Sequence, residues 1–221
     1  MMHSPRSHSY DSSSNSPEFR RIFVERVHLL VQRGYERLVV ADYVDEEEPE
    51  ITGDLVKAID GILDNRPKGW MRFFNAHEET PVNAAGRKGK RRNRVDLRIV
   101  SAQRLPRSHY QFEAKRLGKR NSVSQYLGQK GLGCFLRGDY ARDEDEAGML
   151  GYVQSGDLAE WGTKINAALS DPATDACLDS AIPFFEQSRS STITMRKYYS
   201  RHNRPTVGAS IYITHLLLKF Y

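Results

Sequence analysis

Cysteine is scarce in this sequence, and long apolar runs are missing from it. Only Cys134 and Cys177 occur among 221 residues. Neither has a second Cys or a His at metal-ligand spacing, which excludes a disulfide framework and a structural zinc site. The apolar run at residues 216–218 is far shorter than the roughly 18 residues that a membrane span needs. We therefore expect a cytoplasmic protein without a membrane partner.

A secretory leader is also missing. Residues 1–16 hold seven serines and two histidines but no apolar segment and no small-residue cleavage site. Such a composition cannot bury enough apolar surface to fold, so it predicts a disordered tail. The remaining residues, 17–221, have the length of one domain, and 39% hydrophobic residues in the chain suffice for a core.

Strong charge of one sign is absent from the chain as a whole. The 33 Lys and Arg residues exceed the 28 Asp and Glu residues by only five. The charges are nevertheless segregated, because residues 85–94 carry six positive charges and no negative one, while residues 45–50 and 139–146 are rich in acids. A basic segment of this kind is typical of phosphate-backbone contacts, although many such segments are only solvated surface loops.

The hydrophobic periodicity predicts a mixed α/β chain. Helical spacing, caps and turn residues place helices from Ser16 to Gly34, from Pro49 to about residue 65, from Ser122 to about Lys130 and from Asp157 to Leu169. Alternating or β-branched runs predict strands at residues 70–77, 93–100, 109–117, 148–154 and 207–214, and a further helix is expected at 177–187. Residues 35–43 fit a strand or a helix equally well.

Two neighbouring predicted strands place charged side chains on one face. In residues 93–100 the apolar side chains alternate with polar ones that include Asp96. In residues 109–117 the same period puts Glu113 and Lys115 opposite the apolar side chains. If the strands are joined by the turn between them, Asp96, Glu113 and Lys115 converge on one side of the sheet.

The chemistry of such a group depends on whether water surrounds it. Two adjacent carboxylates raise each other's pKa unless a cation neutralises them, and magnesium prefers oxygen ligands of this kind. A nearby lysine can then assist an attacking water or stabilise charge on a phosphate. The alternative is an ordinary solvated sheet face that carries a Glu–Lys pair.

Asp96, followed after sixteen residues by Glu113-Ala114-Lys115, resembles the motif of the PD-(D/E)XK nuclease superfamily. The resemblance covers about residues 47–169, and Val95 stands where the family motif has proline. It implies a restriction-endonuclease-like α/β core, with a central mixed sheet of four to five strands flanked by helices. Residues 170–221 would then be a C-terminal extension of a single nuclease domain.

The resemblance also implies roles for individual residues. Asp96, Glu113 and the Ala114 carbonyl would bind Mg²⁺, for which Mn²⁺ would substitute, and Lys115 would position or activate a water. The family adds a glutamate from the helix before the first core strand, for which Glu50 is the first candidate and Glu47 the second. Glutamines on the helix after the lysine support such sites, and the candidates are Gln125 and Gln129.

Nucleic acid, with DNA favoured, is the expected partner. The candidates for phosphate contacts are Arg87, Lys88, Lys90, Arg91, Arg92, Arg94, Arg116, Lys119 and Arg120. The sequence thus predicts a Mg²⁺-dependent DNA endonuclease, and the superfamily suggests a setting in bacterial restriction or anti-phage defence. A non-catalytic nucleic-acid-binding subunit on the same fold and an RNA-cleaving toxin are the alternatives.

Control of such an enzyme would come from a regulatory protein or from oligomerisation. The apolar residues 215–221 need burial, either in the core or against the second subunit of a homodimer.

Overall fold

Two helices precede the sheet. The computed structural model describes residues 16–65, 69–82, 92–104, 106–174, 176–179, 183–187 and 192–221. Helix α1 (Pro17–Tyr35) begins where the sequence predicts, because the Ser16 hydroxyl caps it by accepting a hydrogen bond from the Phe19 amide at 3.2 Å. Helix α2 (Glu48–Asp64) is also confirmed, but it begins one residue before Pro49.

A single seven-stranded mixed sheet forms the centre of the molecule. Its strands are β1 (Phe74–Pro81), β2 (Arg94–Ser101), β3 (Ser108–Leu117), β4 (Glu146–Val153), β5 (Phe185–Glu186), β6 (Met195–Arg204) and β7 (Ala209–Lys219). The spatial order is β1-β2-β3-β4-β7-β6-β5. Strand β4 pairs in parallel with β3 and β7, and every other pairing is antiparallel.

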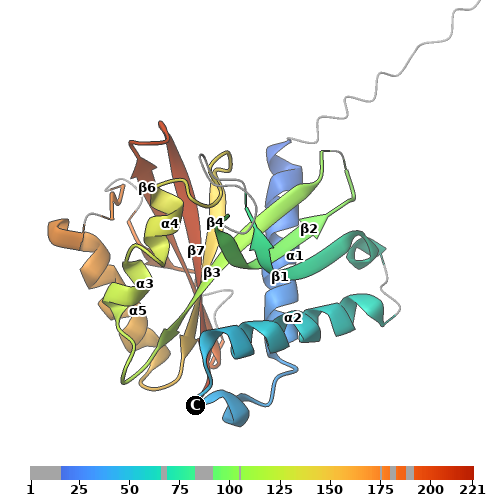
Figure 1. Cartoon of the computed structure of the whole chain (residues 1–221), viewed down its shortest axis with the longest axis horizontal. Coiled ribbons are helices and arrows are strands. Elements are labelled where there is room, and N and C mark those ends of the chain that lie inside the picture. Colours follow the sequence, from blue (N-terminus) through green and yellow to red (C-terminus); the bar gives the residue numbers. More distant parts are fainter. Residues whose placement is uncertain are drawn as a thin grey trace, which may run out of the picture.

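Helices cover both faces of this sheet (Figure 1). Helices α1 and α2 pack on one face and share a core with Leu97, Phe112 and Tyr152. The short helices α3 (Val123–Leu127) and α4 (Leu132–Leu136) and the longer α5 (Leu158–Ser170) pack on the other. The three-layer arrangement confirms the predicted α/β class. Three 3₁₀ turns complete the described elements: η1 (Val40–Tyr43), η2 (Gly69–Phe73) and η4 (Pro172–Thr174).

The predicted count of four to five strands is wrong, because β5 and β6, which the sequence did not predict, join the sheet beside β7. Strand β7 lies between β4 and β6 and extends five residues beyond the predicted strand end at Thr214. Leu216, Leu217 and Leu218 are fully buried there. The apolar terminus is therefore covered within the chain's own core.

Two other segments differ from the sequence-based expectations. The strand expected from residue 70 begins only at Phe74, because η2 precedes it and packs Trp70 edge-on against Phe74. The helix expected at 177–187 is wrong for the described residues 177–179 and 183–187. Their backbone groups bond to β6 instead, with the Asp179 amide donating to the Arg201 carbonyl at 2.8 Å.

The helix expected from Ser122 ends early. Gly128 takes an extended conformation directly after Leu127, and a second short helix, α4, follows from Leu132.

Among the helices that the structure describes, none combines the length and the apolar character that crossing a membrane requires.

Candidate metal centre

The site forms where the pairing between β2 and β3 ends. The last paired residues are Leu97 and Phe112, and β3 continues from there along β4 alone. Asp96 and Glu113 are the next residues on their strands. The Asp96 carboxylate bridges the opening by accepting a hydrogen bond from the Ala114 amide at 2.7 Å. This bond fixes the aspartate beside β3.

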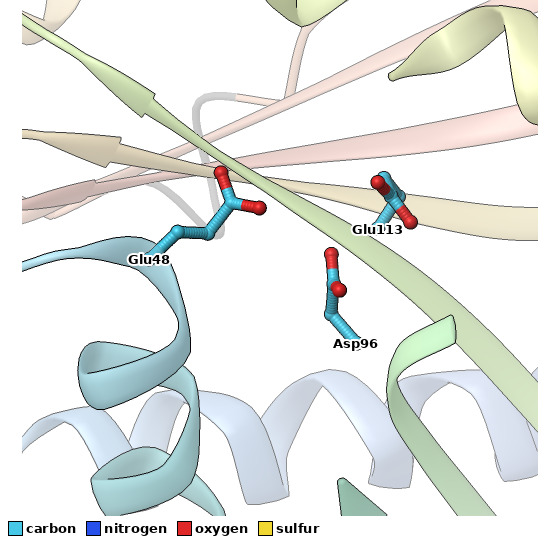
Figure 2. A group of neighbouring side chains, drawn as sticks. All are labelled: Glu48, Asp96 and Glu113. Carbon is cyan, nitrogen blue, oxygen red and sulfur yellow. The ribbon is translucent and has the colours of Figure 1, made fainter. Parts of the chain in front are cut away.

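Three carboxylates meet at this opening (Figure 2). Glu48 at the start of α2, Asp96 on β2 and Glu113 on β3 each offer an oxygen, and these oxygens lie within 4.8 Å of one another. Glu113 is buried, while Glu48 and Asp96 are half-buried. Three elements that are separate in the sequence thus supply one ligand each.

Lys115 points into the same cluster. Its ammonium group donates to Glu113 Oε1 at 2.7 Å and to Glu48 Oε1 at 2.8 Å, and it lies 4.0 Å from Asp96 Oδ2. The Ala114 carbonyl accepts a further hydrogen bond from it. The lysine therefore partly neutralises a group whose three acids outnumber it.

Burial and crowding shift the ionisation of these groups. Burial, followed by the charge of Asp96, raises the pKa of Glu113 to about 8 despite the nearby Lys115. Burial also raises the pKa values of Asp96 and Glu48. For Lys115, burial alone would lower the pKa, but the surrounding carboxylates outweigh it and the net shift is upward. The pKa values of the acids are thus raised mainly by burial, and that of Lys115 is raised by the negative charge around it.

The donor set fits a hard divalent cation. Glu113 Oε2 is buried, and no hydrogen-bond partner for it occurs among the residues that the structure describes. Such an oxygen is costly to bury unless a cation or donor satisfies it. Every ligand atom on offer is oxygen, which suits Mg²⁺ or Mn²⁺ and not a thiolate-seeking metal.

The structure places a different helix glutamate at the site from those favoured by the sequence. Glu50 is exposed on α2, and Glu47 pairs with Arg116 at 2.6 Å. Glu48 takes the third position because it lies three and seven residues before the buried Ile51 and Leu55, on the same side of α2. The run of acids from 46 to 50 was the available signal, but it did not fix which member faces the strands.

A cleft of about 910 Å³ opens from the cluster. Glu48, Glu113 and Lys115 lie in its wall, together with the predicted supporting residues Gln125 and Gln129. The side-chain Oε1 of Gln125 also accepts a hydrogen bond from the Ser122 backbone amide. This bond belongs to the capping box at the start of α3. Residues that the sequence did not single out add to the lining: Asn93, Asn121, Ser124, Arg137, Asp139 and Tyr140.

The predicted phosphate-binding residues divide into three groups. Arg116 lines the cleft, and Lys119 and Arg120 line the two smaller cavities next to it. Arg94 lies on β2 and pairs with Glu79 at 3.1 Å, and Arg92 lies two residues before β2. The remaining four lie outside the described residues: Arg87, Lys88, Lys90 and Arg91.

Comparison with known proteins adds no relative. No family model, no curated protein and no solved structure matches this chain. The resemblance to PD-(D/E)XK nucleases therefore rests on the sequence pattern of Asp96, Glu113, Ala114 and Lys115.

Proposed function

We propose that this protein is a metal-dependent nuclease of the PD-(D/E)XK type that hydrolyses phosphodiester bonds, with DNA as its substrate. One observation carries the proposal. Glu48, Asp96 and Glu113 gather around Lys115 at the end of a strand pairing, and the group opens into a cleft. An ordinary solvated sheet face needs neither the burial of Glu113 nor a third acid brought from α2.

The three carboxylates and the Ala114 carbonyl would hold Mg²⁺, with Mn²⁺ as a substitute. When bound, such an ion polarises a phosphoryl oxygen and lowers the pKa of water. Lys115 supplies a fixed positive charge at the same place, where it can orient a water or balance charge that develops on the phosphate. The limited access of solvent strengthens these interactions.

Basic side chains would hold the phosphate backbone next to the cluster. Arg116 lies in the cleft, and the basic segment 85–94 is proposed to approach the same substrate because its last residue, Arg94, begins β2 two positions before Asp96. Phosphate contacts give affinity without sequence information. The setting that we propose is restriction or anti-phage defence in a bacterial cytoplasm. A regulatory protein or the formation of a homodimer would restrain the enzyme there.

The proposal is tested by incubating the purified full chain with plasmid DNA, linear duplex, single-stranded DNA and RNA, each with Mg²⁺ and with EDTA. We expect cleavage of DNA only with the metal. Cleavage of RNA alone would identify the ribonuclease alternative. Binding without cleavage of any substrate would identify the non-catalytic subunit and overturn the proposal.

Two variants link the activity to the cluster. Asp96→Asn and Lys115→Met should each lower the cleavage rate by roughly a hundredfold or more, the size expected for loss of one transition-state contact. Circular dichroism and DNA binding should remain close to those of the original protein. Lys57→Met is the matched control, because Lys57 is exposed on α2 and pairs with Asp54. Full activity in the first two variants would contradict the assignment.

A further inference from the structure

A tight turn follows the strand that carries Glu113 and Lys115. After β3 ends, Gly118 and Asn121 exchange two backbone hydrogen bonds of 3.2 Å each. Lys119 and Arg120 are the two residues at the tip of this turn, and both are exposed. Two backbone hydrogen bonds that close so short a loop hold its tip in one place. The backbone of the two cationic residues therefore has a fixed position relative to the cluster.

Helix α5 brings a third cation to the same turn. A cavity of about 660 Å³ lies between the turn and α5, and Lys119, Arg120 and Lys164 line it with Asp171 as the one acid of its lining. The Lys164 ammonium lies 4.7 Å from the centroid of the Trp161 ring. That ring is held by an indole N–H that donates to the Ser155 carbonyl at 2.7 Å. The cavity therefore has a rigid wall and a net positive lining.

The positive charges in this cavity form no ion pairs with acids in the part of the chain that the structure describes. Among the described residues, no ion pair involves Lys119, Arg120 or Lys164. By contrast, Arg116 pairs with Glu47, and Arg94 pairs with Glu79. Unneutralised cations around a concavity concentrate their field there and favour an anion.

This basic cavity adjoins the cleft of the metal centre. Asn121 lines both of them, and a third cavity of about 230 Å³ is lined by Arg116, Lys119, Arg120 and Asn121. Lys119 follows Lys115 by four positions along β3 and the turn, which corresponds to roughly 13 Å of extended chain. A mononucleotide in the cleft would not reach the basic cavity, whereas a polymer would.

We infer that Lys119, Arg120 and Lys164 form a second phosphate-binding subsite, which holds the backbone of a polynucleotide a short distance from the metal centre. This inference rests on the proposed function and narrows it. The substrate is a nucleic-acid strand long enough to occupy both places, and neither a mononucleotide nor a small phosphodiester meets that condition. Direct contact with phosphates makes no choice of base sequence.

Binding in EDTA tests the subsite without any turnover. Fluorescently labelled single-stranded DNA and RNA of increasing length are titrated into the full chain at several salt concentrations. The variant is Lys119→Ala/Arg120→Ala/Lys164→Ala. The control is Arg21→Ala/Arg33→Ala/Lys57→Ala, which removes the same charge from exposed positions on α1 and α2. Thermal unfolding verifies that both variants fold.

We expect the original protein to bind longer strands more tightly than dinucleotides. In the first variant, the slope of log K against log salt should fall by about 2, because single strands contribute about 0.7 per phosphate contact. Its affinity should fall by roughly tenfold or more, while the control keeps slope and affinity nearly unchanged.

Three results would overturn the inference: equal losses in both variants, no dependence on strand length, or equally tight competition by inorganic phosphate or polyglutamate. The absence of any strand binding by the original protein would overturn it too. Because no metal or hydrolysis is needed, the subsite can fail while cleavage by the metal centre stands. It can also hold if cleavage fails.

Discussion

Two glutamates of α2 stand two positions apart and have different surroundings. The Glu48 carboxylate is one of the three in the cluster, whereas Glu50 is exposed. We expect Glu48→Gln to weaken Mn²⁺ binding by roughly tenfold or more, since it removes one of three ligand charges. Glu50→Gln should leave the affinity unchanged. Isothermal titration calorimetry measures both, and equal effects of the two variants would contradict the assignment of Glu48.

Glu113 should make stability depend on pH. Burial raises its pKa from 4.5 to about 8 in the folded state, so between these values the folded protein keeps a proton that the unfolded chain releases. Stability is therefore fully present below about pH 4.5 and declines as pH rises through about 8. The groups that face this carboxyl are Asp96, Glu48 and Lys115.

Glu113→Gln removes this titration but keeps the shape of the side chain. In EDTA we expect the melting temperature of the variant, relative to that of the original protein, to increase as pH rises from about 5 to about 8.5. Mg²⁺ should reverse the difference at the higher pH, because it stabilises only the ionised carboxylate. Differential scanning calorimetry measures both effects. Parallel pH profiles in EDTA would show that Glu113 does not titrate in this range.

Much of the site at this scale could be predicted from the sequence. Strict alternation fixes which strand residues share a face, so Asp96, Glu113 and Lys115 were expected to converge. The helix glutamate was predicted wrongly, because the candidates were Glu50 and Glu47 and the structure brings Glu48 to the site. A helix turns by about 100° per residue, so acids that are neighbours in sequence point in different directions, and Glu48 is the one on the buried side of α2.

At the scale of elements, β4 depends on a glycine. A Cβ at Gly148 would overlap the Phe112 ring, which is fully buried in the core. We expect Gly148→Ala to destabilise the protein by about 1–3 kcal/mol, with a loss of roughly 2–4 °C in melting temperature for each kcal/mol. Thermal unfolding followed by circular dichroism measures this change.

Gly61 provides the matched control within α2. A Cβ there would meet its nearest neighbour, an Arg37 guanidinium nitrogen, at an ordinary 3.6 Å. Since alanine is the better helix former, Gly61→Ala should be neutral or stabilising by up to about 1 kcal/mol. A Gly148→Ala protein as stable as Gly61→Ala would show that the Phe112 ring can be displaced.

Local sequence patterns predicted those helices and strands that carry a cap or an alternating pattern in their own residues. Ser16-Pro17 marks the start of α1, and alternation marks β2 and β3. Strand β6 escaped prediction because its interleaved basic and aromatic residues, such as Arg196, Lys197 and Tyr199, resemble a binding surface. They lie in a strand because β6 pairs with β7 over ten positions. Pairing partners distant in sequence cannot be derived from the periodicity of one segment.

At the scale of the whole molecule, the last strand supports a site to which it contributes no ligand. Strand β7 pairs with β4 over eight positions and so holds the neighbour of β3. His215 on β7 shares a hydrogen bond with the Tyr126 hydroxyl of α3, the helix that carries Gln125 beside the cleft. Phe220 packs edge-on against three tyrosines of the α1 and α2 side: Tyr35, Tyr43 and Tyr152.

Deletion of residues 209–221 should therefore abolish folding, although all candidate metal ligands lie between Glu48 and Lys115. Without β7, the strands β4 and β6 lose their shared partner and both cores open to water, because Leu216 and Leu217 belong to opposite faces of the sheet. Removal of Tyr221 alone, which is exposed, should change stability by less than about 0.5 kcal/mol. Near-UV circular dichroism and metal-induced thermal shifts measure both truncations. A folded, metal-binding protein that lacks β7 would show that residues 47–169 form an independent core and that the terminal strands are an accessory.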